Sequence, residues 1–239
     1  MKTLFYSAAI IECIILASCA SNETANSDAV KQSEIYQSYS VTYDAGDMEL
    51  NATASYRFGG STGTTLNLTS PSKVTFNGDD MARDNNIFSG TFYNISKQTD
   101  FKGQYEFKYT DNDKKTYTNK AILASIELGE YPSQADKSTG LMVKWANPVT
   151  NNERVYLYIE DAKNNSAYAS TDVVGATTVE LTAEEMKILV PGNVNIYLTR
   201  EVNSSLADAS HLGGIMYLKF ISKKVGINLT GDAPAEAKK

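Results

Sequence analysis

The chain has 239 residues, of which 42% are hydrophobic and 21% charged, and its 22 basic and 28 acidic side chains give a formal net charge of -6. This is the composition of a globular protein with enough apolar material for one large domain or two small ones. A single His excludes a multi-histidine metal site, and Cys13 and Cys19 are the two cysteines, so no disulfide can form among the later residues. The acidic balance argues against nucleic-acid binding. We expect no cofactor.

The N-terminal residues have the pattern of an export signal. Met1-Lys2 precede an apolar run over residues 4–17 that is too short to span a membrane and leads into Leu16-Ala17-Ser18-Cys19. This tetrapeptide resembles the lipobox of bacterial lipoproteins. The resemblance implies that residues 1–18 are a signal peptide, that Cys19 becomes the first residue, and that its thiol carries diacylglycerol. An ordinary signal peptide is the alternative, and Glu12 departs from the pattern because a carboxylate weakens membrane insertion.

The residues after the cleavage site favour a lipid-held protein on a flexible tether. By the same resemblance, Ala20 rather than Asp after the lipidated Cys favours the outer membrane of a Gram-negative cell, with the acyl chains as the anchor. Residues 20–28 contain no apolar side chain larger than Ala, and such a segment cannot bury enough surface to offset its ordering entropy. We therefore expect residues 19–33 to form a tether.

The next part of the chain alternates with the period of a β-strand. Six apolar positions alternate with polar ones between residues 48 and 58, and they are Met48, Leu50, Ala52, Ala54, Tyr56 and Phe58. The turn composition at residues 44–47 predicts a hairpin with the preceding run, and residues 111–115 predict another between residues 105–109 and 117–128. Short strands at this spacing favour a β-sandwich over residues 34–128.

A second β unit follows an aperiodic stretch at residues 129–139, which we interpret as a linker. Over residues 140–229 the spacing resembles a fibronectin type III or immunoglobulin-like module. The resemblance depends on a strand that ends in Trp145, on a strand over residues 155–159, and on the Pro191-Gly192 turn before the next long strand. No disulfide is present, unlike in antibody domains. Residues 183–189 are the one helix candidate, and residues 230–239 are expected to be a disordered tail. The predicted fold is all-β, with two tandem immunoglobulin-like β-sandwiches after the tether.

No set of side chains points to catalysis, so we expect a protein that is not an enzyme. His211 has no Gly-x-Ser-x-Gly motif beside it, and exposed loop histidines are common. The carboxylate pairs lie where turns and helix starts favour acidic residues, and they are Asp44/Asp47, Asp79/Asp80, Asp111/Asp113 and Glu184/Glu185. Asp111 and Asp113 have alternating oxygen ligands and are a weak calcium candidate, since their loop lacks the Gly and distal Glu of an EF-hand.

The candidate binding face consists of four tyrosines in the second unit. If Val155, Leu157 and Ile159 point inward, strict alternation turns Tyr156 and Tyr158 outward. The same argument turns Tyr197 and Tyr217 outward from the strands over residues 194–199 and 215–221. The fibronectin-like resemblance implies that these three strands are neighbours in one sheet. Tyr is a good strand residue and forms cross-strand pairs, which accounts for the pattern without a ligand; a protein partner and a glycan are the functional alternatives.

These observations predict a non-enzymatic interaction module, held in the outer membrane by its N-terminal lipid. We expect it to act as an accessory subunit of an envelope complex or as a surface adhesin, with a protein partner. The alternative is a surface lipoprotein that binds a glycan through the exposed tyrosines.

Metabolic labelling with a palmitate analogue tests the anchor. The wild-type chain should take up the label, and Cys19→Ala should not, because the thiol is the attachment point. A Cys19→Ala protein that is still labelled contradicts the lipobox assignment.

Overall fold

The computed structural model of the chain describes residues 23–86 and 90–232. Within these residues the protein is built from strands, and its helical pieces are the 3-10 turns η1 (Ser27–Ala29), η2 (Gln32–Glu34) and η3 (Glu185–Ile188). The all-β prediction is therefore confirmed. The helix candidate at residues 183–189 shortens to η3. The signal peptide, Cys19 and residues 233–239 of the predicted tail lie outside the described residues.

The described strands follow one another closely along the chain. In order they are β1 (Thr24–Asn26), β2 (Ile35–Asp44), β3 (Glu49–Phe58), β4 (Thr64–Asn67), β5 (Lys73–Phe76), β6 (Asp79–Asp80), β7 (Ala82–Asn86), β8 (Gly90–Gln98), β9 (Gln104–Thr110), β10 (Thr116–Ile122), β11 (Gln134–Asp136), β12 (Leu141–Lys144), β13 (Glu153–Asp161), β14 (Ser166–Thr171), β15 (Thr178–Leu181), β16 (Gly192–Ser205), β17 (Gly214–Ile221) and β18 (Val225–Thr230).

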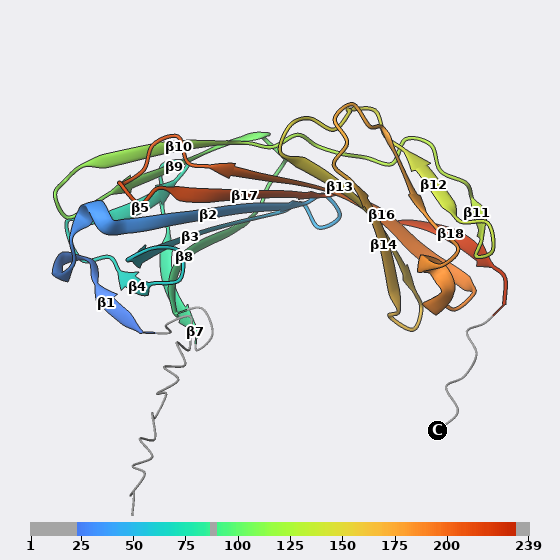
Figure 1. Cartoon of the computed structure of the whole chain (residues 1–239), viewed down its shortest axis with the longest axis horizontal. Helices are drawn as coiled ribbons and strands as arrows, with labels where there is room; N and C mark the ends of the chain where they lie inside the picture. The colour runs from blue at the N-terminus through green and yellow to red at the C-terminus, as the bar shows by residue number, and fades with distance from the viewer. Residues whose placement is uncertain (1–22, 87–89, 233–239) are drawn as a thin grey trace, which may run out of the picture.

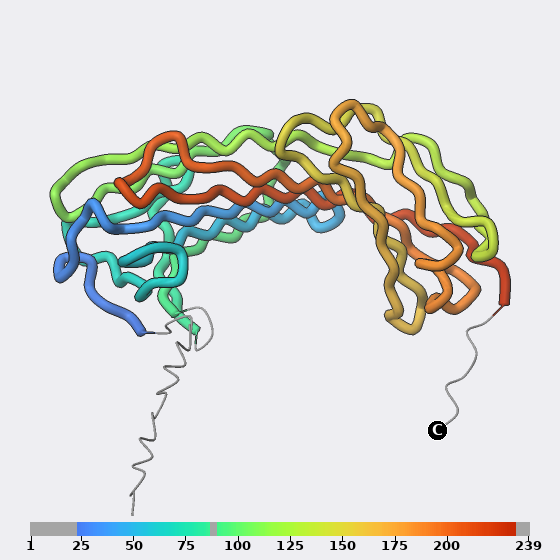
Figure 2. Tube along the Cα trace, in the orientation of Figure 1, coloured from blue at the N-terminus to red at the C-terminus, as the bar shows by residue number. Residues whose placement is uncertain are grey.

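Three sheets form two layers. A 12-stranded sheet runs in the order β1-β4-β3-β2-β17-β16-β13-β14, with β8 and β7 joined at β3, and β18 and β11 joined at β16. A four-stranded sheet (β10-β9-β5-β6) and a two-stranded sheet (β12-β15) form the second layer. The molecule is an arch in Figures 1 and 2, and both small sheets lie on its outer curve. The uncovered face of the large sheet therefore forms the inner curve, which we call the concave face.

The alternation of the sequence determines which face of each strand is buried. Buried and half-buried residues alternate over all ten positions of β2, and the hairpin with β3 places Val41 opposite Ala52. Four of the six predicted inward positions of the second strand are buried, and Phe58 packs at the edge of the core. Met48 is different: it lies in the turn with φ 52° and is 54% exposed, because the strand begins only at Glu49.

Aromatic side chains join the two layers under β2 and β3. Tyr39 of the large sheet stacks on Phe107 of β9 with ring centroids 4.5 Å apart, and Tyr56 lies 4.2 Å from Tyr109. Such pairs contribute about 0.5–1.5 kcal/mol each beyond the burial of their surface. At the other end of the arch, Leu141 and Val143 of β12 are fully buried and pack in the same core.

Strand β17 connects the two halves of the large sheet. It pairs antiparallel with β16 and parallel with β2, and the second ladder runs over eight residue pairs from Gly214 and Gln37 to Ile221 and Asp44. A Cβ on Gly214 would lie 2.2 Å from the carbonyl oxygen of Gln37, so only glycine allows this approach. The predicted adjacency of β13, β16 and β17 is confirmed. The pairing with β2 had no sign in the sequence.

Strand β16 is the point at which the arch bends. Its first residues pair with β18 on one edge, and its last residues pair with β17 on the same edge. Between these partners, Leu198 and Ser222 exchange hydrogen bonds: the Leu198 amide donates to Ser222 Oγ, and the Ser222 amide donates to the Leu198 carbonyl, both at 2.9 Å. Strands from both halves of the molecule are therefore hydrogen-bonded to the same edge of β16.

Two segments predicted to be irregular contain strands. Within residues 19–33, β1 pairs parallel with β4, and Ser27 is fully buried. Ser27 Oγ accepts a hydrogen bond from the Thr69 amide at 2.9 Å and shares another with the Thr69 hydroxyl at 3.2 Å. The tether prediction is wrong from Thr24 onward, because hydrogen bonds to hydroxyl groups order a segment that has no large apolar side chain. Within residues 129–139, β11 pairs with β18. The division of the chain into two domains stays a prediction.

Arg200 forms an ion pair inside the bend. Its Nη1 lies 2.8 Å from a carboxylate oxygen of Glu153, its Nη2 donates to the Asn147 carbonyl, and the Arg200 and Glu153 side chains are 1% and 9% exposed. Arg200, in the middle of β16, is thereby tied to the first residue of β13 and to the loop before it. Removing one partner of such a pair leaves an uncompensated buried charge.

We expect Arg200→Ala to lower the free energy of unfolding by about 3–5 kcal/mol, as measured by urea denaturation. Arg154→Ala is the matched control, because its ion pair with Asp172 is half exposed and should contribute little. Equal losses in the two variants would contradict this account of the bend.

Candidate functional site

The concave face carries four tyrosines packed against each other. We call Tyr156 and Tyr158 of β13, Tyr168 of β14 and Tyr197 of β16 the tyrosine cluster. Tyr158 stacks on Tyr156 at 5.8 Å and on Tyr197 at 5.1 Å, and Tyr168 lies 6.1 Å from Tyr156 and 5.8 Å from Tyr158. The register explains the contacts, since Tyr158 is directly opposite both Tyr168 and Tyr197.

Sequence reasoning placed three members of this cluster and missed the fourth. Tyr156, Tyr158 and Tyr197 lie together on the outward face, as their alternation with buried residues requires. Tyr168 was missed because residues 166–171 were not assigned to a strand. The signal in the sequence was the pair of small residues Ala167 and Ala169 on either side of it, which are buried and alternate with exposed residues from Ser166 to Ser170.

Tyr217 is on the same face but outside the cluster. It lies on β17, opposite Asn203 of β16, and is 46% exposed. It makes no ring contact with another aromatic residue of the described chain. Tyr168 is likewise 59% exposed, so both rings present apolar surface on the concave face.

A charged group closes one end of the tyrosine cluster. Tyr197 Oη donates to Glu160 at 2.9 Å, and Lys224 Nζ lies 2.7 Å from the other Glu160 oxygen and 4.9 Å from the centre of the Tyr197 ring. The hydrogen bond and charge of Lys224, with the Tyr197 hydrogen bond, lower the pKa of Glu160. Burial and the neighbouring Glu160 carboxylate raise the pKa of Tyr197. The phenol therefore stays neutral over the physiological range.

An open pocket of about 450 Å³ lies at the other end of the cluster, at the bend of the arch. Its lining comes from the ends of β13 and β14, from β16 and from β17: Asn152, Glu153, Arg154, Tyr156, Asp172, Glu201, Asn203 and Tyr217. Its size is within the range of small-molecule sites. We call it the elbow pocket.

Every carboxylate of the elbow pocket has a cationic partner. Asp172 pairs with Arg154 at 2.6 Å, Glu201 with Lys219 at 3.0 Å, and Glu153 with the buried Arg200. The Arg154 hydrogen bond and charge lower the pKa of Asp172. The charges therefore compensate each other. The polar side chains of the lining that have no hydrogen-bond partner among the described residues are the amides of Asn152 and Asn203 and the hydroxyl of Tyr217.

The weak calcium candidate is part of a hairpin. Asp111 is 2% exposed, and its carboxylate accepts hydrogen bonds from the Lys115 amide at 2.8 Å and from Tyr117 Oη at 3.4 Å. Asp113 lies exposed in the same turn. The Asp111 carboxylate thus stabilises the turn through these hydrogen bonds. The described residues hold no group of three His, Cys, Asp or Glu side chains that could bind a metal.

The other acidic pairs also have local partners. Asp44 accepts from the amides of Gly46 and Asp47, Asp79 pairs with Lys97, and Glu185 accepts from the amide and hydroxyl of Thr182 at the start of η3. His211 is exposed in the loop before β17. None of these groups lies in the lining of the elbow pocket.

No protein-family model matches the chain, and no curated protein matches its sequence. Solved structures share little with it. A tetra-tandem repeat from the extending region of a large adhesion protein is 13% identical, with a TM-score of 0.26. The match covers 81% of this chain and 49% of the repeat structure, so this chain spans about half the length of that protein chain. The chicken CNTN1 FN1–FN3 domains are 9% identical (TM-score 0.23; 72% of this chain, 62% of theirs).

A third structure is the Bacteroides ovatus SGBP-B of a mixed-linkage glucan utilization locus, solved with a mixed-linkage heptasaccharide. It is 9% identical with a TM-score of 0.25, over 76% of this chain and 53% of that one. No helix of the described residues is long and apolar enough to cross a membrane.

The charged end of the cluster predicts a pH effect on stability. Because the folded protein lowers the pKa of Glu160 below its usual 4.5, the ionised form stabilises the fold above about pH 4.5, and the contribution is lost as the pH falls through the lower folded value. The difference in melting temperature between wild type and Glu160→Gln should be constant above pH 5 and shrink below about pH 4.5. A difference that grows in acid contradicts the assignment.

Proposed function

We propose that the chain is a lipid-anchored, non-enzymatic binding module of the outer membrane and that its concave face is the binding surface. The tyrosine cluster is the observation that carries this proposal. Ring stacking within the sheet accounts for Tyr156, Tyr158 and Tyr197, which are half-buried. It does not account for Tyr168 and Tyr217, whose rings remain exposed on the face that no second layer covers.

Physical properties of the face support binding. Tyrosine provides a large contact area at a low cost in side-chain entropy, and it is enriched at the energetic centres of interfaces. The cluster is already packed, and Glu160 and Lys224 fix one end of it, so a ligand would meet a preorganised surface. The exposed rings of Tyr168 and Tyr217 add apolar surface that a ligand could bury on this face.

The anchor and the absence of catalysis rest on separate arguments. The Leu-Ala-Ser-Cys sequence supports lipid attachment at Cys19, and Ala20 supports the outer membrane. The ion pairs of the elbow pocket support a binding role. A neighbouring cation lowers the pKa of a carboxylate, and such a carboxylate is a poor general acid at neutral pH. The partner is a protein, as for an envelope subunit or an adhesin, or a surface glycan; the exposed tyrosines suit both.

Loss of the cluster should weaken binding strongly. The mature chain carrying Tyr156→Ser, Tyr158→Ser and Tyr197→Ser is mixed with envelopes from cells that lack this protein. The amount of this variant that sediments with the envelopes should be at least about tenfold lower than for wild type, since several interface rings are removed. Tyr168→Ser alone provides a variant whose exposed position spares the fold.

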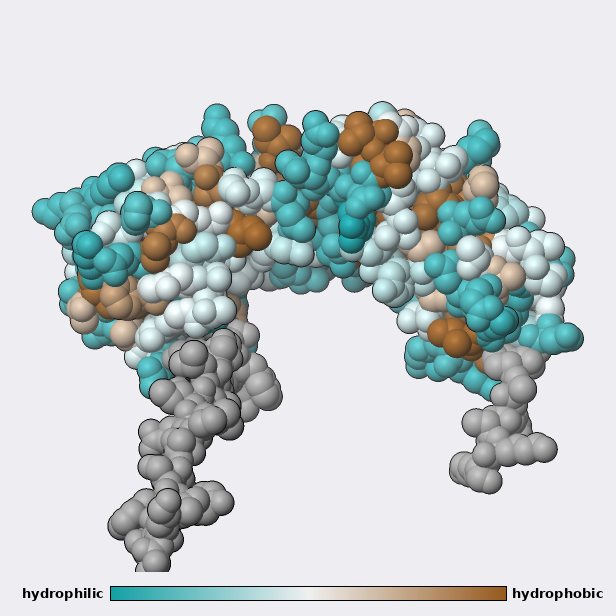
Figure 3. Space-filling model, viewed as in Figure 1, coloured by the Kyte–Doolittle hydropathy of each residue, from teal (hydrophilic) through white to brown (hydrophobic). Residues whose placement is uncertain are grey.

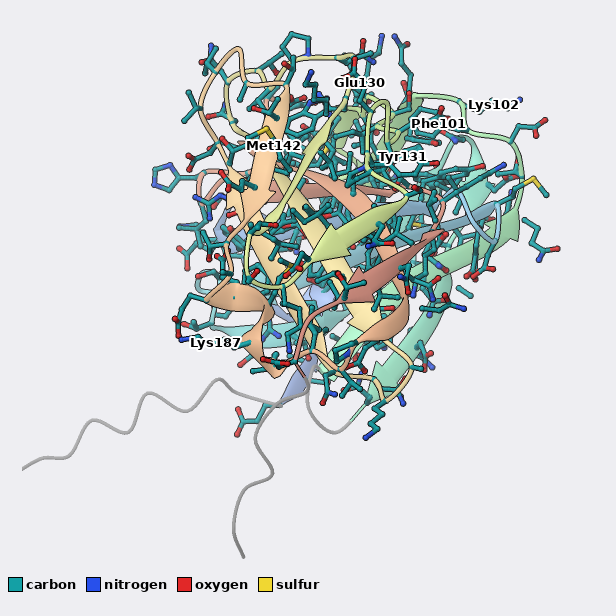
Figure 4. The ribbon with its side chains drawn as sticks, turned by 90° about the vertical axis from the view of Figure 1, so that its right-hand side faces the viewer. Phe101, Lys102, Glu130, Tyr131, Met142 and Lys187 are labelled. Atoms are coloured by element: carbon teal, nitrogen blue, oxygen red, sulfur yellow. The ribbon has the colours of Figure 1, made fainter. Side chains whose placement is uncertain are left out.

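Tyr131→Ser is the matched control. This tyrosine is 40% exposed between β10 and β11, outside the cluster, and lies in the upper half of Figure 4, close to the label of Phe101. Its binding should equal that of wild type. Unchanged binding by both cluster variants would refute the concave face as the binding surface.

A further inference from the structure

The concave face carries a row of neutral polar side chains that continues from the elbow pocket across the large sheet. The register places Asn203 of β16 opposite Tyr217 of β17, Tyr217 opposite Ser40 of β2, Ser40 opposite Thr53 of β3, and Thr53 opposite Asn94 of β8. We call Asn203, Tyr217, Ser40, Thr53 and Asn94 the hydroxyl-amide row. None of the five carries a charge at neutral pH.

The row lies on the uncovered side of the sheet. Ser40 and Thr53 alternate with the buried residues of β2 and β3, and they are half-buried at its centre, whereas Asn203 and Tyr217 are exposed at the pocket. Pale and teal residues line the middle of the inner curve in Figure 3, and prominent brown groups lie along the outer curve above it. The row is thus a shallow polar path with one aromatic ring at its pocket end.

The chemistry of this path suits a neutral polyhydroxylated ligand. Amide and hydroxyl groups both donate and accept hydrogen bonds, as sugar hydroxyls do, and a tyrosine ring can pack on the apolar face of a pyranose. An anionic or cationic ligand would find no unpaired charge at the elbow pocket, because each carboxylate there is already paired. A protein partner would require apolar contact, which the centre of the row does not offer.

Spacing adds a second argument. Neighbouring strands lie about 4.8 Å apart, so side chains in register across a sheet repeat at that distance. This repeat is close to the length of one sugar in an extended glycan chain. A chain crossing the strands would therefore present about one sugar to each strand between β16 and β8.

We propose that the concave face binds a neutral polysaccharide, which crosses the strands along the hydroxyl-amide row and enters the elbow pocket against Tyr217. This inference rests on the proposed function and specifies its ligand class. In this arrangement the tyrosine cluster lies beside the pocket, and the polysaccharide continues past Tyr156 toward it.

Isothermal titration calorimetry with defined sugars tests the inference. The mature chain, with Cys19→Ser to keep it free of lipid, is titrated with neutral cello-, laminari-, xylo- and mannohexaose and with acidic hexagalacturonate. At least one neutral hexasaccharide should bind, and hexagalacturonate should bind more weakly than that sugar. Asn203→Ala and Thr53→Val should weaken binding by about three- to tenfold each, because each removes a hydrogen-bonding group and little else.

Asn193→Ala is the matched control for Asn203→Ala. It changes the same residue type on the same strand, but Asn193 lies at the far end of β16, opposite Asn228. Its affinity should equal that of wild type. Unchanged affinity in both Asn203→Ala and Thr53→Val, or tighter binding of hexagalacturonate, would overturn the inference.

The outcomes for the two proposals are separable. If no neutral hexasaccharide binds while envelope binding still depends on the tyrosine cluster, the polysaccharide inference is wrong and the concave face binds a protein. If envelope binding is indifferent to the cluster, the proposed function itself fails, whatever the sugars do.

Discussion

The parallel ladder between β17 and β2 is the constraint on which the rest of the structure depends. It joins a strand near the end of the chain to one near its beginning, and closing so long a loop costs entropy that only a long ladder and a shared core can offset. Phe220 of β17 provides part of that core, since its ring lies 5.6 Å from Tyr43 and 4.9 Å from Phe101. Without this ladder, the large sheet would separate between β2 and β17.

The continuity of the sheet determines where a ligand can bind. The small sheets cover the outer side of the arch, so the chain's polar outward positions collect on the inner side from β8 to β14. Within that surface, the charges at the bend and at Glu160 are paired, and Asp44, Glu49 and Arg57 lie near the ends of β2 and β3. Hydroxyls and amides occupy the middle. The Arg200 and Glu153 pair fixes the bend from the buried side. The elbow pocket therefore forms where the two halves of the sheet meet and not within either.

Much of this could be predicted from local pattern, because strand alternation is a local property. Period two placed Leu50 to Tyr56 in the core and turned Tyr156, Tyr158 and Tyr197 outward. Pairing between distant strands leaves no such trace: nothing in residues 214–221 distinguishes a neighbour of β2 from an edge strand. Met48 and the segment from Thr24 were misplaced, because a turn and hydroxyl hydrogen bonds overrode the pattern and the composition. Tyr168 was missed because its strand is short.

The measurement that tests this account most directly is native-state hydrogen exchange along a denaturant series, read by mass spectrometry on peptides covering β2, β13, β16 and β17. Because one sheet runs through both halves, amides of β2 and β17 should lose protection together, with the same free energy of opening as those of β13 and β16. If β2 exchanges at low denaturant while β13 and β16 remain protected, the two halves are independent units and the concave face is not one continuous surface.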